Sequence, residues 1–459
     1  MISILQTLKE LTEKLYKVDL IGKDLGQFLE ECQSTFDEFI LSYTSQRIEE
    51  LDNAIFLARE ERENFKVIKK DVPRNLETRH GLLEYSRRYY RDSETRNHCY
   101  LTDLALSIEP YQRLEDNLQL SLVEAASSMS YRQASKLVCV NPVSASTVMK
   151  AIRSVSVPEL ADENEQDKKK VDEIHIQADE DHVHLQSERR SSGQIRFAAI
   201  HENKKKVGKN RYQLTNRKIV SSVNEKPSDF ADRVLDSLDS LYELDYVKRI
   251  YVHGDGASWI RTLKETLPRS ISVFDHFHLE RALLGVCQGD GRLRTMLREC
   301  LSPWDDEKLE KELQILVDSD VCTGEKAEEL WTYLQNNKEG IVNHFSLDHG
   351  GSCAEGLVSH IFSRRFSRDP LSWSYEGLEK LSAIRVHLEN GNKLDRTMLR
   401  KKEIVEAEKM EPILSAAKSW AQGNKKDVQD WSVRIPGSEL SSGAIGAIMR
   451  GINKGGFIC

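Results

Sequence analysis

The residues of this sequence best suited to chemistry are acids at the ends of predicted strands and helices. Asp255 lies between two glycines in residues 253–260, HGDGASWI, directly after a stretch at 247–252 that is rich in β-branched and aromatic residues. The glycines allow a sharp turn and leave the carboxylate uncrowded, which suits a ligand for a metal ion or a charged substrate. A helix is predicted to begin at Trp259, so this aspartate could instead cap that helix.

Asp179 and Asp181 lie near the end of a strand predicted over residues 173–186. Side chains alternate faces along a strand, so the two aspartates share a face that could meet Asp255, while Glu180 points the other way. Acids have a poor intrinsic preference for strands and need a reason to be there. The alternative to a shared site is an exposed strand edge.

Glu355 is the third candidate acid, at the start of a helix predicted to run to about residue 362. Ser352 and Glu355 have the spacing of a capping box, in which the glutamate would satisfy only the backbone. Three carboxylates in one pocket repel one another unless cations neutralise them, and hard oxygen ligands suit Mg²⁺ or Mn²⁺. Two such ions, roughly 4 Å apart, would support phosphodiester cleavage and transfer.

A short cluster at residues 274–279, FDHFHL, follows another predicted strand. Asp275 and His278 have the spacing to share one side of a helix start, and His278 could contact a phosphate. Metal ligation by Asp275, His276 and His278 is one interpretation. A helix cap formed by Asp275 is the other.

The elements that must position these residues alternate in a recognisable order. Strands are predicted at 173–186, 194–201, 212–223, 247–252 and 270–277, with helices on both sides of the fourth strand, the first at 230–244. Three strands followed by helix, strand, helix and strand is the order of a ribonuclease H-like domain, an α/β fold with a mixed sheet. That fold gathers carboxylates from the first strand, the fourth strand and a late helix.

The length of 459 residues allows two to four domains. We predict a helical N-terminal region at 1–70, a small mixed unit with a helix-turn-helix at 71–156, an acidic linker at 157–172, the catalytic domain at 173–278 and 351–392, a helical insertion at 279–350, and a helical and glycine-rich tail at 393–459.

Three short helices at 118–128, 131–138 and 144–155 fit a helix-turn-helix, although any small helical hairpin has the same pattern. The last helix would present Ser146, Thr147, Lys150 and Arg153 to DNA.

Basic residues are unevenly distributed in a chain whose net charge is -8. Residues 203–218 contain seven basic side chains and no acid. Lys204, Lys205 and Lys206 there, and Arg364 and Arg365 further on, are candidates for phosphate contacts. A solvated hairpin tip would show the same charge pattern.

The composition predicts a protein that stays in the cytoplasm. No apolar run is long enough to cross a membrane, the first residues lack the features of a signal peptide, and no membrane partner is expected. The eight cysteines are scattered without a Cys-x-x-Cys pair, so we expect reduced thiols rather than a zinc site or disulfides.

Several motifs together resemble those of the ISLre-type insertion-sequence transposases of bacteria, which belong to the DDE superfamily and are related to the Mutator-like group. The resemblance covers roughly residues 70–390. It rests on the segments 88–91 (RYYR), 108–113 (IEPYQR), 178–183 (ADEDHV), 253–260 (HGDGASWI), 274–279 (FDHFHL) and 351–360 (GSCAEGLVSH), in that order.

The resemblance implies a ribonuclease H-like catalytic domain with a helical insertion before the last acid. Asp179, Asp255 and Glu355 match its catalytic acids, the ligands of two Mg²⁺ or Mn²⁺ ions, and Asp275 and His278 match an accessory Asp-x-x-His signature. The first motif reads Asp-Glu-Asp where relatives often have Asp-Gly, so Asp181 competes with Asp179 for the first position.

The implied function is a DNA transposase that binds terminal inverted repeats, cleaves them in a metal-dependent reaction and joins them to target DNA. We expect at least a homodimer, because two ends must be held together. The alternatives are a ribonuclease H-like nuclease without joining activity and a domesticated DNA-binding regulator.

Overall fold

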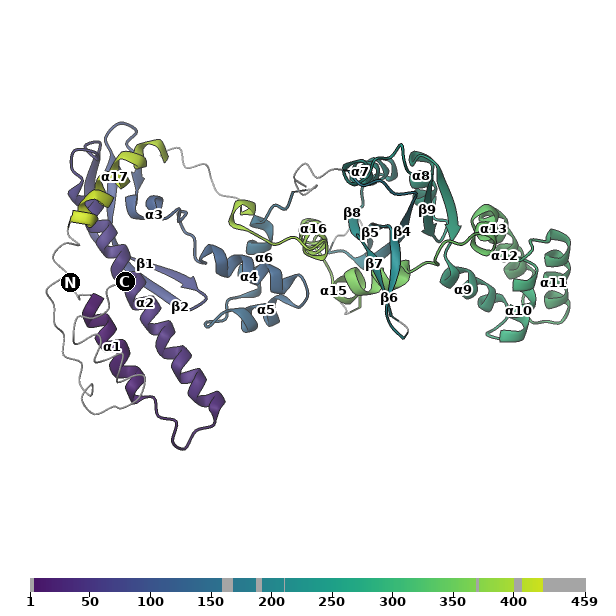
Figure 1. The fold of residues 1–459 in the computed structure, drawn as a ribbon, viewed down its shortest axis with the longest axis horizontal. Helices are drawn as coiled ribbons and strands as arrows, with labels where there is room; N and C mark the ends of the chain where they lie inside the picture. The colour runs from purple at the N-terminus through teal and green to yellow at the C-terminus, as the bar shows by residue number, and fades with distance from the viewer. Residues whose placement is uncertain are drawn as a thin grey trace. The chain divides into compact units, whose positions relative to one another are not determined.

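A computed structural model describes residues 4–158, 168–186, 192–209, 211–368, 371–399 and 407–423, drawn in colour in Figure 1. Most of the predicted acidic linker and the glycine-rich end of the tail lie outside these ranges. The chain forms two compact units, and each combines helices with a sheet. The first comprises the described parts of Met1–Leu122, Tyr131–Val148 and Leu399–Cys459, and the second Val123–Ser130 and Met149–Met398.

The N-terminal part of the first unit, predicted to be helical over residues 1–70, contains two helices and the beginning of a strand. Helices α1 (Ile4–Lys17) and α2 (Leu25–Leu57) are followed from Phe65 by a strand, β1 (Phe65–Thr78), which pairs antiparallel with β2 (Gly81–Asp92). The predicted helical region of 1–70 therefore ends early. A short strand, β3 (His98–Cys99), completes the sheet, and helix α3 (Leu101–Ala105) follows it.

The tail contributes a helix to this first unit. Helix α17 (Ala407–Gly423) packs against α2 and α3, and its Met410 and Ile413 are buried in one core with Ile55 and Tyr90. The predicted helical tail at 393–459 thus contains a helix, and that helix contributes to the core of the first unit.

The three short helices of the predicted helix-turn-helix are present, with bounds within two residues of those expected. They are α4 (Asp116–Ala126), α5 (Tyr131–Val138) and α6 (Ala145–Ser154). The apolar residues Val148, Ala151 and Ile152 of α6 are buried, as the helical spacing predicts.

The second unit is built on a five-stranded mixed sheet in the order β10-β9-β4-β5-β8. Strands β4, β5 and β8 pair antiparallel, and β9 and β10 run parallel to β4. The strands are β4 (Glu173–His184), β5 (Ser192–His201), β8 (Lys218–Val223), β9 (Arg249–Gly254) and β10 (Ser270–Phe274).

The basic segment forms a separate hairpin, where one continuous strand was predicted at 212–223. Strand β6 (Asn203–Gly208) pairs antiparallel with β7 (Arg211–Thr215), and β8 begins only at Lys218. Asn216 separates the two strands with a φ of 51°, and this left-handed backbone interrupts extended structure.

Different helices cover the two faces of the five-stranded sheet. Helices α7 (Pro227–Leu241) and α8 (Ser258–Thr266) pack on the face that carries Ile174, Ile176 and Ala178. Alternate residues of β4 therefore point to the other face. There α14 (Ala354–Val358) continues through a π-helical turn, Ser359–Ser363, into α15 (Arg364–Phe366), while α16 (Tyr375–Glu389) lies beside β8.

The helical insertion has a core of its own, as expected of a unit of this size. It consists of α9 (His276–Val286), α10 (Gly291–Glu299), α11 (Asp306–Asp318), α12 (Gly324–Asn336) and α13 (Lys338–Ser346). It begins slightly before the predicted residue 279, and α13 packs on β10. No helix within the described ranges combines the length and the apolar character needed to span a bilayer.

Candidate functional site

Asp179 lies on β4 just beyond the end of its pairing with β9. The register joins Gln177 to His253, so Asp179 continues past the end of the neighbouring strand, on the face away from α7 and α8. Its side chain is 8 % exposed. One carboxylate oxygen accepts a hydrogen bond from the backbone N–H of Glu180 at 2.8 Å.

Asp255 occupies the turn directly after β9, and the turn depends on its glycines. Gly256 has a φ of +82°, and a Cβ there would lie 1.9 Å from Oδ1 of Asn337. Oδ1 of Asp255 accepts from the N–H of Ala257 at 3.0 Å. Ala257 is itself the N-cap of α8, so Asp255 braces the turn and the predicted helix cap is not formed.

Glu355 projects from the first turn of α14 and is exposed. The capping box predicted for it is not formed, because the N-cap is Cys353 and has no side-chain hydrogen bond. Ser352 accepts from the N–H of Ala354 at 3.3 Å and donates to Oε1 of Gln177 at 3.1 Å. With the start of the helix supported in this way, the Glu355 carboxylate remains available for other contacts.

Asp179, Glu355 and His278 come together, with one ligand atom from each within 4.8 Å of the others. The pKa of Asp179 is raised to about 7, chiefly by burial; the charges of Asp255, Glu355 and Asp275 also raise it, and the hydrogen bond from Glu180 opposes the shift. Asp255 follows His253, the register partner of Gln177, and the N–H of Asp275 donates to the carbonyl of Gly254 at 2.8 Å. Acids that follow β9 and β10 thus lie at the same end of the sheet as Asp179.

Asp275 forms the helix cap that was one of its two predicted roles. It is 3 % exposed, and Oδ1 accepts from the N–H groups of Phe277 at 2.8 Å and His278 at 3.1 Å. This cap fixes the first turn of α9 and carries His278 to the acids. His276 stacks on His344 with ring centroids 5.3 Å apart, and among the described residues His278 groups with Asp179 and Glu355 rather than with Asp275 and His276.

Asp181 lies on the same face of β4 as Asp179 but in different surroundings. Its Oδ1 accepts hydrogen bonds from the hydroxyls of Ser363 at 3.0 Å and Ser367 at 2.9 Å, while the buried Oδ2 has no partner. Burial raises its pKa, and the two serines lower it. The structure therefore places Asp179, and not Asp181, among the other acids.

The donor set of the cluster fits a divalent cation. Carboxylate oxygens are the ligands that Mg²⁺ and Mn²⁺ prefer, and an imidazole nitrogen is acceptable to Mn²⁺. Within the described ranges, Asp179, Asp255 and Glu355 form no ion pair that would neutralise them. The cluster has ligand atoms that could hold one cation, and the binding of one or two Mg²⁺ or Mn²⁺ ions stays a prediction.

The basic hairpin contains one lysine with a structural contact. Lys205 and Lys206 are exposed, as a phosphate-binding role requires. Lys204 is only partly exposed, and its ammonium group donates to the backbone carbonyls of Gly350, at 2.9 Å, and Gly351. Lys204 thus has a contact within the unit, and its role as a DNA contact stays a prediction.

Of the two arginines of α15, one is exposed and the other forms contacts within the unit, as with the lysines of the hairpin. Arg364 is exposed, but Arg365 is 5 % exposed, donates to the carbonyl of Ala126 at 2.9 Å and lies over the ring of Trp373. The prediction of Arg365 as a DNA contact is wrong, because its guanidinium group is used to hold the unit together.

The candidates on α6 are likewise divided. Ser146 and Lys150 are exposed and Thr147 is half-buried, so these remain possible contacts. Arg153 forms an ion pair with Glu376 at 3.1 Å, which occupies the guanidinium group and weakens its case as a DNA contact.

A row of neighbouring histidine rings, which begins on the face of the sheet that carries Asp179, was not predicted. Neighbouring rings are 5.2 to 5.6 Å apart between centroids. Burial lowers the pKa of His175 to about 4 and that of His201 to about 3, so these rings are neutral near pH 7. The row comprises His201, His175, His253, His349, His344 and His276. Its members are scattered in sequence, and only the alternation along β4 and β9 could have indicated part of it.

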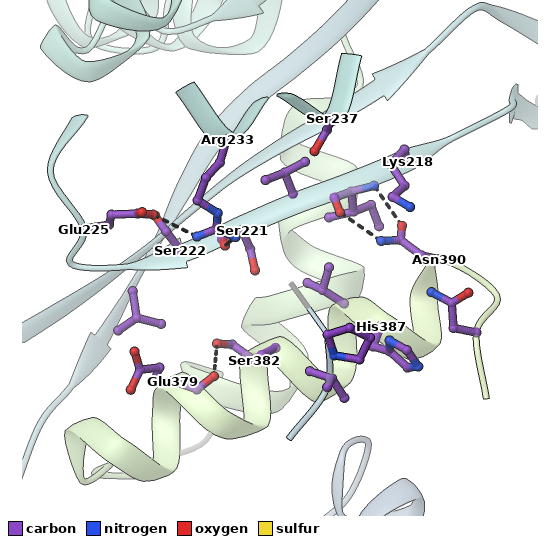
Figure 2. Close-up of a pocket in the computed structure, with 18 of the residues that line it drawn as sticks. Lys218, Ser221, Ser222, Glu225, Arg233, Ser237, Glu379, Ser382, His387 and Asn390 are labelled. Carbon is purple, nitrogen blue, oxygen red and sulfur yellow. Dashed lines mark hydrogen bonds and ion pairs between the residues drawn. The ribbon is translucent and has the colours of Figure 1, made fainter. Parts of the chain in front are cut away.

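A polar cavity of about 330 Å³ lies between β8, α7 and α16 (Figure 2). Its polar groups bind one another: Arg233 pairs with Glu225 at 3.0 Å, and the Asn390 side chain bonds both backbone groups of Ile219. In the sheet, β5 and β4 separate β8 from β9, so this cavity is distinct from the acid cluster.

Comparison with known proteins gives a family but no activity. UPF0236 protein TTE2489 of Caldanaerobacter subterraneus subsp. tengcongensis is 34% identical over 411 residues, which cover 88% of each chain. UPF0236 protein TTE0610/TTE0881/TTE1053/TTE2432 of the same strain is 33% identical over 412 residues, 88% of this chain and 87% of the relative. The family described as "Uncharacterised protein family (UPF0236)" matches residues 23–403. The chain therefore belongs to the UPF0236 family.

Proposed function

We propose that this protein is a DNA transposase of the DDE type, which binds the terminal inverted repeats of an insertion sequence, cleaves them and joins them to target DNA. The observation that carries the proposal is the convergence of Asp179, Glu355 and His278, with Asp255 close enough to raise the pKa of Asp179. These acids come from the strand, turn and helix that the resemblance to ISLre-type transposases implies.

The strand arrangement supports a ribonuclease H-like fold for the second unit. The first strand of the sheet, β4, is central. On one side of it β5 pairs antiparallel with β4 and β8 pairs antiparallel with β5; on the other side β9 and β10 run parallel to β4. That arrangement is the one expected for this fold, and it puts Asp179 beside the turn that holds Asp255. The helical insertion before Glu355 agrees with the same resemblance.

The names of the relatives give a second line of support. One UPF0236 protein of Caldanaerobacter subterraneus subsp. tengcongensis, 34% identical over 413 residues, bears eleven designations in a single strain. A protein known under many designations in one genome is expected of a sequence that is copied to new positions. Copying of its own gene to new positions is what a transposase achieves.

Asp179, Asp255 and Glu355 would hold Mg²⁺ or Mn²⁺ in this mechanism, with His278 beside them. The bound ions would activate the attacking water or 3'-hydroxyl and stabilise the leaving oxygen. Burial of Asp179 keeps its carboxylate fixed on the sheet, and the Asp275 cap fixes His278. Two DNA ends must be held together, so we expect at least a homodimer that acts on nucleoid DNA in the cytoplasm.

The test is Asp255→Asn in the full chain. Inverted-repeat DNA should still bind in a gel shift, while strand cleavage and strand transfer with Mg²⁺ should be lost. A variant that cleaves at the wild-type rate would refute the proposal. With the wild-type protein, cleavage without joining of precleaved ends would indicate a nuclease, and binding without any metal-dependent cleavage would indicate a regulator.

A further inference from the structure

The glycine-rich loop before Glu355 is held from two sides by side chains that are remote in sequence. Gly350 and Gly351 have φ values of +67° and +75°, a backbone that is intrinsically adaptable. On one side, Oε1 of Gln177 accepts from the Cys353 N–H at 2.9 Å and from the Ser352 hydroxyl at 3.1 Å. On the other side, the Lys204 ammonium group donates to both glycine carbonyls.

Gln177 is well placed to set the distance between two of the acids. It lies two residues before Asp179 on the same face of β4, and Cys353 lies two residues before Glu355. The amide is fully buried, and its Nε2 contacts Nε2 of His201 at 3.1 Å, which fixes its orientation. A single rigid side chain thus ties the strand that carries one acid to the loop that carries the other.

Lys204 adds a contact that its neighbours do not share. Along β6, Lys205 points to the opposite face and is exposed, while Lys204 is partly buried against the loop. An ammonium group near acids that bind a cation would by charge alone oppose the cation. The Lys204 ammonium group instead donates to the carbonyls of Gly350 and Gly351, and these hydrogen bonds hold the loop in place.

We propose that Gln177 and Lys204 are positioning residues that set the place of Glu355 through the loop at residues 350–353. This inference rests on the proposed metal-dependent function and extends it to residues outside the group that could hold the metal ion. Supporting residues of this kind typically change metal affinity by roughly 10–100-fold.

The experiment measures Mn²⁺ binding to the full-length protein without DNA by isothermal titration calorimetry. Lys204→Met should weaken the affinity about ten-fold, Lys204→Arg should restore most of it, and Gln177→Leu should weaken it more. Lys205→Met is the matched control, because it removes the same charge without the loop contact, and it should leave the affinity unchanged or slightly higher.

The direction in which Lys204→Met changes the Mn²⁺ affinity distinguishes the two possible roles of Lys204. Loss of a loop contact weakens Mn²⁺ binding, whereas loss of a positive charge alone strengthens it. Lys204→Met that binds Mn²⁺ as well as or better than the wild type, or Lys205→Met that weakens binding equally, would overturn the inference. Gln177→Leu could fail to fold, so Lys204→Met is the deciding variant, with its melting temperature measured alongside. Glu355→Gln is the reference: if it binds Mn²⁺ normally, the proposed site itself is wrong; if it binds weakly while Lys204→Met does not, only the positioning inference fails.

Discussion

Asp179 and Asp181 lie two residues apart on one face of β4, and both are buried, yet their surroundings differ completely. Asp179 lies among acids and a histidine from other elements, with a pKa raised to about 7. Asp181 is bound by two serine hydroxyls of the helical segment after Glu355. Residue type, burial and strand face are the same, so only the partners contributed by other elements distinguish a candidate metal ligand from a structural acid.

The largest expected effect is on DNA cleavage. Asp179→Asn should reduce single-turnover cleavage of inverted-repeat DNA by more than about 100-fold, because loss of a ligand should exceed the loss typical of a supporting residue. Asp181→Asn should reduce it by less than about ten-fold. Gel shifts with both variants check that DNA binding is intact, and the reverse order of effects would make Asp181 the first acid.

The next effect concerns the pH dependence of metal binding. A proton on Asp179, with a pKa of about 7, competes with the cation, so Mn²⁺ affinity should fall about ten-fold from pH 6 to pH 5. Calorimetric titrations at several pH values measure this. Asp181→Asn should keep the dependence and Asp179→Asn should flatten it; an equal slope in both variants would contradict the comparison.

The same pKa has a consequence for the stability of the metal-free protein. Because the folded-state pKa lies above the value of about 4 in an unfolded chain, the native state holds a proton that the unfolded state releases. The contribution of Asp179 to stability is therefore lost as pH rises from about 4 to about 7. Thermal melts with a chelator should show this loss, and Asp179→Asn should reduce it.

Removal of the partners of Asp181 should affect stability and leave the metal site unchanged. Ser363→Ala with Ser367→Ala leaves a buried carboxylate without donors, which should lower the free energy of unfolding by about 1–3 kcal/mol. Urea denaturation measures this change. Mn²⁺ affinity should stay within about two-fold, and a large loss would mean that Asp181 shares the site after all.

The smallest effect is expected at Glu180, which lies between the two aspartates but points to the other face. Its carboxylate accepts from Nε1 of Trp259 at 2.6 Å. Glu180→Gln keeps an acceptor there, so unfolding free energy should change by less than about 1 kcal/mol. Both DNA cleavage and Mn²⁺ affinity should match the wild type. A loss of either would show that any carboxylate charge on β4 supports the site, whichever face its side chain points to.

Periodicity predicted most elements of the second unit, because buried strands and amphipathic helices leave strong local patterns. The strand predicted at 212–223 was wrong because a left-handed residue, Asn216, interrupts it, and asparagine carries only a weak signal for that conformation. The helical N-terminal region was extended too far for a similar reason, since the polar turn after Leu57 has no strong stop signal.

The candidate site was less predictable than the fold, because its contacts are long-range. The ambiguity between Asp179 and Asp181 depends on Ser363 and Ser367, which lie more than 180 positions further along the chain. Arg365 is indistinguishable from Arg364 by composition, yet only one of them reaches the carbonyl of Ala126. Local sequence identifies the acids as unusual, but it does not say which other elements they meet.

The wide spacing of the acids has a consequence for biosynthesis. Asp179 and Asp255 can meet once β4 and β9 have paired, but Glu355 follows the whole helical insertion in the chain. A polypeptide still on the ribosome therefore lacks a complete ligand set until residue 355 of 459 has been made. If the protein cuts DNA as proposed, unfinished copies would be harmless to the gene that encodes them.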